Sequence, residues 1–558
     1  GGMNMKRKLA NKVLAVIICL CMAVLILPFS VFAGTGTTDT CAFNVAGGTY
    51  GTDYTYSETL DDTTNVMDKV LTVLTNTPLT ITADSTVTDA RIEVAENVKN
   101  ANITISELKL ELNEFNGSPL TVKSGSTLTL TISGKNTLDG YAAGPGILVE
   151  NGAELTINGT EKDVLDVFGA QMHLYVNQGD MSGGQNVGFA GIGGPNSSDA
   201  YTYTGKITIN GGTVNAHGYG YGAGIGGGDY GSGGTITING GVVTATTGEG
   251  LPGGWIDSTK ANASGIGASQ GQPGGVITIT GGRVIAYGGY ASAGIGGGTA
   301  DVTITGGNVT AYGGPLAAGI GGYNQNKGDI KITIGKDATV TAYAGSSASA
   351  IGQGSDTSAP VTLKIENGAK VYAFSREGSD RPAITQVANS AADPANMINA
   401  YITGMTLSED MPIVAELDGD TVNLTVPKGS GGAAFTTGAA GEYTAKTAAE
   451  VPPQNVVYQF ILEDNSKATV TSGTEFGMEK VKAVEAGDFT KEPAPEAKAD
   501  YENNRLTGLV AGANYRLEAG EYSLEATADE NGYIIHKDFP AFYGLQISII
   551  KLGDGVST

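Results

Sequence analysis

The sequence predicts an all-β protein, a right-handed parallel β-helix with three faces per coil, followed by small C-terminal β domains. Three observations support this prediction. A short Ile-Thr-Ile-x-Gly-Gly-x-Val phrase recurs with variations across residues 206–354, three apolar positions recur in its copies, and helical periodicity is absent there. Because self-similarity at a period of tens of residues is typical of solenoids, we expect each copy to form one coil.

The register of the repeat follows from counting its apolar residues. Equivalent strands begin at isoleucines separated by 29, 41, 25, 30 and 31 residues, namely Ile209, Ile238, Ile279, Ile304, Ile334 and Ile365. A valine follows each isoleucine by five or six residues, and another isoleucine comes eleven residues after four of these valines. Three inward stacks, with coils about 4.8 Å apart, predict three faces and confine the length variation to loops.

The N-terminal residues are predicted to carry a targeting signal. Residues 1–33 contain four basic residues, then an apolar run at 13–27, and end in Val31-Phe-Ala, which predicts a secretory signal peptide. We therefore expect a secreted or cell-surface protein with no membrane span once the signal is removed. An exported chain without a cysteine pair to form a disulfide suits a bacterial surface. Residues 34–67 are predicted to form an N-terminal cap, because an uncovered end coil would be an open sheet edge.

The β-helix itself is predicted at residues 68–396, with 160–188 as a loop or side excursion that departs from the repeat. Residues 397–449 are β-rich and are expected to cap the last coil. A small β segment follows at 450–484, and residues 485–500 form a linker rich in Pro, Ala and Glu. Residues 501–558 are predicted to be a small β module.

Charge and cysteine content exclude several functions. The net charge is -24, and removal of the four basic signal residues takes it to -28, so nucleic acid is not an expected partner. Such acidity suits calcium or neutral sugars as ligands, although solubility explains it equally well. Of three cysteines, Cys19 and Cys21 lie in the signal, so Cys41 alone can form neither an intrachain disulfide nor a cysteine-based metal site.

The main candidate binding site is a column of rings. Three residues after each valine of the second strand come His217, Thr246, Tyr287, Tyr312, Tyr343 and Phe374. Alternation along a strand points these side chains outward, so rings about 4.8 Å apart would form a ladder that could stack on a glycan. The alternative is that the rings only stabilise neighbouring coils. We favour this alternative over glycan binding because stacking between coils needs no ligand. On the glycan hypothesis, Tyr312→Ala with Tyr343→Ala abolishes glycan retention at an unchanged melting temperature.

Two further sets of residues are candidates. Trp255, in the long insertion at 250–263, is interpreted either as a sugar platform or as a side chain that closes over a corner. Asp229, Asp301 and Asp329 are placed in equivalent turns, where stacked carboxylates would repel one another unless Ca²⁺ bridged them. Solvated turn residues are the favoured interpretation of these aspartates.

Catalysis is not expected. Polysaccharide lyases and hydrolases need clustered carboxylates, whereas outward carboxylates occur singly in these repeats and Arg283 is their one arginine. His173, His217 and His536 are far apart in the sequence, and the Gly-rich phrases lack the Gly-Lys-Ser/Thr of a phosphate-binding loop.

The phrase at 207–214, together with Ala-Gly-Ile-Gly-Gly-Gly at 223–228, resembles the Gly-rich β-helix repeats of pectin-lyase-like surface proteins of Firmicutes. It is also similar to clostridial β-helical carbohydrate-binding proteins, and residues 505–509 with 553–555 resemble a β module near the C-termini of such surface proteins. The resemblance covers roughly residues 90–390 and 500–558, and implies binding of plant-wall polysaccharide and calcium without cleavage. We therefore expect a non-catalytic protein that binds a polysaccharide or a host or cell-wall glycan, such as an adhesin. The alternatives are a structural stalk that displays the C-terminal modules and a pectin-lyase-like lyase or hydrolase.

Overall fold

A computed structural model describes most of the chain. The described residues are 41–61, 66–112, 117–140, 144–173, 186–196, 202–248, 261–326, 328–355, 359–366, 368–379, 381–385, 398–403, 407, 410–417, 420–436, 444–447, 457–461, 467–471, 497–500, 505–519, 522–535 and 548–551. They form two compact units, one of residues 1–445 with 451–478 and one of residues 446–450 with 479–558. The predicted signal peptide lies outside the described residues, as does most of the linker at 485–500.

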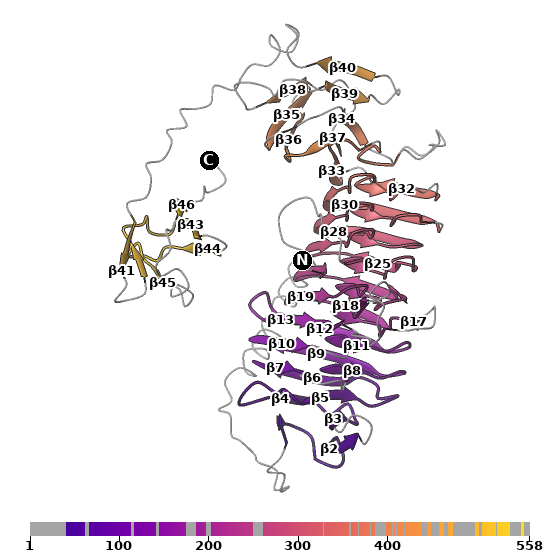
Figure 1. The fold of residues 1–558 in the computed structure, drawn as a ribbon, viewed down its shortest axis with the longest axis vertical. Coiled ribbons are helices and arrows are strands. Elements are labelled where there is room, and N and C mark those ends of the chain that lie inside the picture. Colours follow the sequence, from indigo (N-terminus) through magenta and orange to yellow (C-terminus); the bar gives the residue numbers. More distant parts are fainter. Residues whose placement is uncertain are drawn as a thin grey trace, which may run out of the picture. The chain divides into compact units, whose positions relative to one another are not determined.

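The first unit is a parallel β-solenoid without helices in its described residues, which confirms the predicted fold class (Figure 1). Each regular coil places one strand on each of three faces. The first face contains β18 (Lys206–Ile209), β22 (Thr235–Ile238), β25 (Gly275–Ile279) and β32 (Val361–Ile365). The second face contains β19 (Thr213–Gly218), β23 (Val242–Thr247), β26 (Arg283–Tyr287) and β33 (Lys370–Arg376). In β28 (Ala300–Tyr312) and β30 (Ile330–Tyr343), a single strand runs through both faces.

The third face is built from two-residue strands. These are β16 (Ile192–Gly193), β20 (Ile225–Gly226), β24 (Ile266–Gly267), β27 (Ile295–Gly296), β29 (Ile320–Gly321) and β31 (Ile351–Gly352). In the described part of the chain, this face forms an 11-stranded sheet, and the other two faces share a 20-stranded sheet. The Ala-Gly-Ile-Gly phrase is therefore one side of every regular coil, and not a connecting loop.

The same architecture continues toward the N-terminus with less regular sequence. The first face there contains β4 (Leu79–Thr82), β6 (Ala101–Ser106), β9 (Thr127–Ser133) and β12 (Glu154–Asn158). The second contains β7 (Lys109–Glu111), β10 (Lys135–Asp139) and β13 (Val164–Phe168), and the third contains β3 (Val66–Val73), β5 (Ala90–Val94), β8 (Leu120–Val122) and β11 (Ile147–Val149). The prediction of a loop throughout 160–188 was wrong for β13, which pairs in parallel with β10 and β19. Its Val-Leu-Asp-Val-Phe alternation buries Leu165 and Val167 in the core.

Two short pairs of strands lie beside the coils. β14 (Gln171–His173) pairs antiparallel with β15 (Asn186–Gly188), so the excursion expected in this region begins after β13. β17 (Thr202–Tyr203) pairs in parallel with β21 (Gly231–Ser232). The Thr204 hydroxyl, buried beside this second pair, lies 2.9 Å from the carbonyl oxygens of Gly226 and Ser232.

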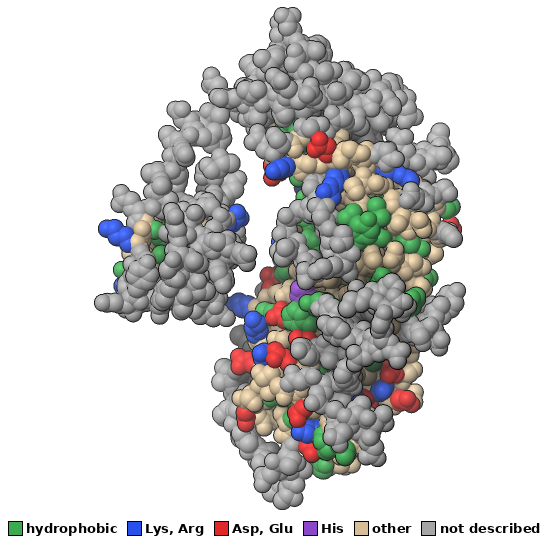
Figure 2. Space-filling view, in the orientation of Figure 1, with side chains coloured by type: hydrophobic (Ala, Val, Ile, Leu, Met, Phe, Trp, Pro, Cys, Tyr) green, Lys and Arg blue, Asp and Glu red, His purple; other side chains and the backbone are tan. Residues whose placement is uncertain are grey.

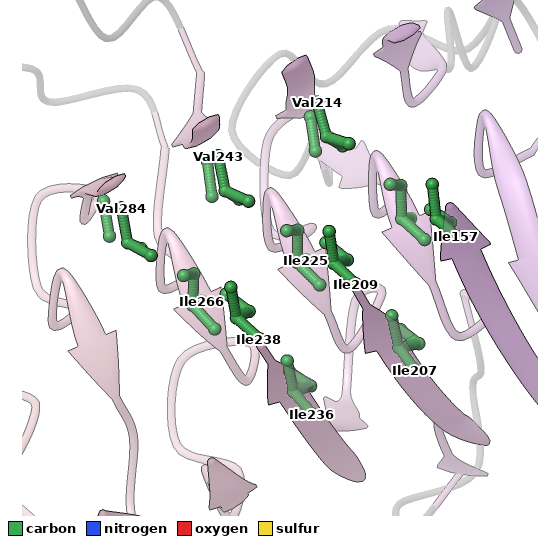
Figure 3. Packing of buried hydrophobic residues seen from close by; sticks show 14 of the residues in the cluster. Ile157, Ile207, Ile209, Val214, Ile225, Ile236, Ile238, Val243, Ile266 and Val284 are labelled. Carbon is green, nitrogen blue, oxygen red and sulfur yellow. The ribbon is translucent and has the colours of Figure 1, made fainter. Parts of the chain in front are cut away.

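The core consists of the three predicted stacks. In strand register, Ile209 lies opposite Ile238, Val214 opposite Val243, and Ile225 opposite Ile266. Figure 3 shows these residues in separate rows, one residue per coil. All are fully buried, and each contributes about 1.5–3 kcal/mol through loss of apolar surface to water. The registers counted from the sequence are confirmed.

Glycine residues allow the backbone of the third face to approach neighbouring backbone closely. Gly267 has a φ of +138°, and a Cβ built on it would overlap the carbonyl oxygen of Gly296 on the next coil. Gly265, two residues earlier, lies against the backbone of Tyr287, and a Cβ there would come 2.7 Å from the Tyr287 nitrogen. The strands of the third face thus pass close to the end of the second face, an approach that only glycine permits.

Antiparallel strands close the parallel ladder at both ends. β1 (Asn44–Ala46) pairs antiparallel with β4, and β2 (Tyr54–Asp61) forms a hairpin with β3. At the other end, β37 (Ser430–Thr436) pairs antiparallel with β33. There the Thr436 hydroxyl accepts a hydrogen bond from the Val371 N–H at 2.9 Å and donates one to the Ala369 carbonyl at 2.8 Å.

Further strands follow the last coil. β34 (Ile398–Thr403) also pairs with β37, β35 (Met411–Leu417) forms a hairpin with β36 (Asp420–Val426), and β38 (Thr444–Thr447) joins their sheet. β39 (Val457–Ile461) and β40 (Lys467–Thr471) form a second hairpin.

The N-terminal coils carry a network of ion pairs. Arg91 lies 2.9 Å from both Asp68 and Glu93, and Lys123 lies 3.6 Å from Glu93 and 3.2 Å from Glu150. Figure 2 shows acidic and basic side chains close together over this part of the solenoid. Networks of this kind add more to stability than isolated surface pairs do.

The second unit is a small β module of two three-stranded sheets. One contains β41 (Lys498–Asp500), β42 (Arg505–Thr507) and β45 (Ile534–Ile535), and the other contains β43 (Asn514–Ala519), β44 (Tyr522–Thr527) and β46 (Ser548–Lys551). Tyr515 and Leu517 are fully buried in its core, and the Tyr515 hydroxyl accepts a hydrogen bond from the Val510 N–H at 2.9 Å.

Candidate functional site

The predicted ladder is present as a continuous column at the end of the second face. His217 lies opposite Thr246, Thr246 opposite Tyr287, and the register continues through Tyr312, Tyr343 and Phe374. The structure adds Phe168, which lies opposite His217. The sequence interpretation missed this residue because it placed β13 in a loop.

The rings stack on one another. The ring centroids of Tyr287 and Tyr312 are 4.7 Å apart with planes 3° from parallel, and those of Tyr312 and Tyr343 are 4.4 Å apart at 4°. Phe168 and His217 form a similar pair at 4.8 Å and 8°, whereas Phe374 is tilted by 32° from Tyr343. Both faces of Tyr312 and of Tyr343 therefore pack against neighbouring rings, and only the edges of these two rings remain for a ligand to contact.

The expected exposure of the ladder is wrong at two positions. Tyr287 is 4% exposed and Phe374 is 3% exposed, while His217, Tyr312 and Tyr343 are half-buried. The side chains do point away from the coil core, as alternation requires. Tyr287 is enclosed between Tyr312 and Thr246, and Phe374 lies beneath strand β37, in which Ala433 is its register partner.

Burial also sets the ionisation of the ladder. It raises the pKa of Tyr312, further raised by the neighbouring Tyr343 hydroxyl, and it raises the pKa of Tyr343. Burial lowers the pKa of His217, an effect that Asp166 partly opposes. The imidazole Nδ1 lies 2.7 Å from the Thr246 hydroxyl oxygen, so Thr246 continues the column by a hydrogen bond in place of a ring. At neutral pH the ladder is therefore an uncharged row of rings and hydroxyl groups.

The three aspartates considered as candidate calcium ligands do not come together. Asp301 lies on β28, opposite Lys331 in the register, and forms a 2.9 Å ion pair with it. Asp329 is an exposed residue just before β30, and Asp229 is buried in the turn before β21. The assumption of equivalent turns was therefore wrong, because the loops between coils differ in length. Within the described ranges, no three His, Cys, Asp or Glu side chains are grouped so that they could hold a metal ion.

Asp229 is nevertheless an unusual carboxyl group. It is 7% exposed, and burial raises its pKa to about 6, opposed in part by a hydrogen bond from the Tyr230 N–H. Its neighbour Tyr230 has a φ of +58°, and the backbone N–H of Asp229 donates to the Gly188 carbonyl at 3.1 Å. Ionisation of this side chain at neutral pH therefore occurs at the expense of folding stability.

Asp229→Asn is expected to stabilise the protein at about pH 7.5 but not below about pH 4. Between the unfolded pKa near 3.8 and the folded pKa near 6, the folded chain keeps a proton that the unfolded chain releases, so stability falls as pH rises. Above about pH 6 the loss of folding stability caused by ionisation of Asp229 reaches its full size, which is at most about 3 kcal/mol. Denaturant unfolding at the two pH values measures it. A variant that loses stability at the higher pH would contradict the inference that ionisation of Asp229 costs folding stability.

Trp255 and most of its insertion lie outside the described residues, so its interpretation stays a prediction. Cys41 is a free thiol, and burial raises its pKa. No helix that is both long and apolar enough to cross a membrane occurs in the described part of the chain.

Comparison with known families agrees with the coil geometry. A family model described as the Beta helix repeat matches residues 207–229, 236–270, 277–299 and 302–323. The chain is a parallel β-helix protein. Each matched stretch of this β-helix contains a second-face strand, a ladder residue and an Ala-Gly-Ile-Gly or Ser-Gly-Ile-Gly phrase. No curated protein and no solved structure matches the chain.

Proposed function

We propose that this β-helix is a secreted or cell-surface protein that binds a polysaccharide without cleaving it. The observation that carries the proposal is the repetition of neutral side chains along the outside of successive coils. On the first face, Thr208, Thr237 and Thr278 lie opposite one another in register. A polymer of similar units can make similar contacts with each coil in turn, and many weak contacts then add up to useful affinity.

The stacking of the ring ladder supports the interpretation favoured from the sequence, that the rings stabilise neighbouring coils. Aromatic residues bind sugars through their open faces, but the faces of Tyr312 pack against Tyr287 and Tyr343. We therefore assign the ladder mainly to stabilisation of neighbouring coils. Its half-buried hydroxyl groups can add hydrogen bonds to a ligand at the edge.

On the first face, the disposition of carboxylates supports binding rather than cleavage. Glycoside hydrolysis uses two carboxyl groups about 5–9.5 Å apart across the scissile bond. On the outside of the first face, Glu154 pairs with Lys206 at 3.2 Å and Asp301 with Lys331 at 2.9 Å. These carboxylates are neutralised by their partners and lie on different coils.

A structural stalk is the second candidate. The observation that favours it is the continuous ladder, together with the antiparallel strands β1 and β37 that close the two ends of the solenoid. Such a body would hold the C-terminal module at a distance from its point of attachment.

Retention on immobilised polysaccharides, combined with assays for reducing sugars and unsaturated products, separates the alternatives. The expected result is retention of the protein lacking residues 1–33 on at least one polysaccharide, without product. Failure to bind any polysaccharide would leave the stalk, and release of either product would establish an enzyme.

A further inference from the structure

Two columns of polar side chains run along the outside of the first face. In the first, a threonine lies on each of seven successive coils, in register with the next, namely Thr129, Thr156, Thr208, Thr237, Thr278, Thr303 and Thr333. The second column lies two residues further along the strands and contains Thr131, Asn158, Asn210, Asn239 and Thr280. We call these two columns the Thr/Asn face.

Hydrogen bonds between coils hold the second column in order. The Asn210 side chain donates to Asn158 at 2.9 Å, Asn239 donates to Asn210 at 2.9 Å, and the Thr280 hydroxyl donates to Asn239 at 2.8 Å. All the bonds run in one direction, so each amide is fixed in orientation although Asn210, Asn239 and Thr280 are exposed. Side chains fixed in advance lose little conformational entropy when a ligand binds.

The column keeps unused hydrogen-bonding capacity. A side-chain amide has two N–H donors and a carbonyl oxygen with two lone pairs. In Asn210 and Asn239, the bonds within the column engage one donor and one lone pair each. Each amide can therefore donate to a ligand and accept from it without breaking the column, and this pairing suits hydroxyl groups, which both donate and accept.

The face is also electrically neutral, although the chain carries a net charge of -24. The charged side chains bordering the threonine column form pairs, Glu154 with Lys206 and Asp301 with Lys331. Lys364, next in register after Thr333, pairs with Glu366 at 3.2 Å. A surface of paired charges and neutral hydroxyl and amide groups suits an uncharged ligand better than an ionic one.

We propose that the Thr/Asn face is the surface that binds polysaccharide, and that its ligand is a neutral, extended glycan lying along the solenoid axis. This assignment rests on the proposed function. The face offers polar groups about 4.8 Å apart between coils and about 6.7 Å apart along a strand. Successive sugar units donate to and accept from the amides of one column, while their C–H groups pack on the methyl groups of the other.

The test compares two variants of the protein lacking residues 1–33. The face variant carries Thr237→Val, Thr278→Val, Asn210→Ala and Asn239→Ala. The control carries Thr310→Val, Thr341→Val and Asn308→Ala on the outside of the second face, where Thr310 and Thr341 are also register partners. Valine keeps the branched shape of threonine and replaces its hydroxyl with a methyl group.

The probes are insoluble cellulose, mannan and xylan, with polygalacturonate as an anionic comparison. We expect the face variant to lose at least about tenfold in affinity for a neutral glycan that the unmodified protein retains, with the control unchanged and added salt without effect. If the face variant does not fold, as judged by circular dichroism, the variant with only the two threonine changes is expected to show a smaller loss in the same direction.

The other outcomes are distinguishable. If the unmodified protein binds a neutral glycan and both variants bind it equally well, the face is not the site, although the proposed function stands. Binding only to polygalacturonate, or binding abolished by salt, overturns the neutral ligand. If the unmodified protein binds none of the probes, the proposed function fails and this assignment fails with it.

Discussion

Gly267→Ala is expected to destabilise the solenoid by about 3 kcal/mol or more, the largest effect of any single methyl group that we anticipate. The φ of Gly267 is +138°, a conformation that residues with a Cβ rarely adopt. The added Cβ would also overlap the Gly296 carbonyl oxygen on the next coil. The backbone of one of these two third-face strands would therefore have to move. Denaturant unfolding followed by circular dichroism measures the loss.

Gly378→Ala is the matched control. Gly378 also has a positive φ, +75°, but a Cβ built there meets no atom within 4 Å. Its expected cost is only about 1 kcal/mol, from the backbone conformation alone. Equal losses in the two variants would contradict the conclusion that close approach between coils, rather than φ, makes glycine necessary on the third face.

Tyr312→Ala combined with Tyr343→Ala is expected to cost about 3–5 kcal/mol of stability. This reverses the outcome that exposed rings would predict, an unchanged melting temperature. Truncation removes a stacked pair 4.4 Å apart and uncovers the faces of Tyr287 and Phe374, which are now buried. The effects of the two changes should not be additive, because the residues are in contact.

Tyr312→Phe with Tyr343→Phe separates packing from hydrogen bonding. Phenylalanine keeps the stack and removes both hydroxyl groups, so we expect a loss of only about 1 kcal/mol. Polysaccharide retention measured on both double variants completes the test. A truncated variant that keeps its melting temperature but no longer binds would restore the ladder as the binding site.

The regular coils were predictable because the spacing of their apolar residues determines the strand register. Branched residues at fixed intervals have to face inward together, since a slip of one residue would turn all of them toward water. Counting therefore placed Ile209, Val214 and Ile225 on three separate faces, and their strand partners confirm it. β13 was missed because Leu165 and Val167 occur without the Gly-Gly corner that precedes Val214, Val243, Val284 and Val309.

The candidate site was less predictable, because the exposure of a side chain depends on which other segments of the chain pack against it. Alternation correctly turned Tyr287 and Phe374 away from the core, but it carries no information about a strand such as β37 that packs over Phe374 from far along the chain. The prediction that Asp229, Asp301 and Asp329 occupy equivalent turns was wrong for a related reason. Similar turn sequences do not align when loop lengths differ, and Asp301 proved to be a strand residue with its own lysine.

Loop length and coil register are independent in this chain, and this independence bears on how the protein can change during evolution. The intervals between equivalent isoleucines range from 25 to 41 residues, yet every pair of coils compared keeps the same strand partners. A whole coil can therefore be duplicated or deleted in one genetic event without disturbing the fold of the others. Each such event would lengthen or shorten the Thr/Asn face by one step. If that face binds a glycan as proposed, recombination alone would adjust the length of glycan that it contacts.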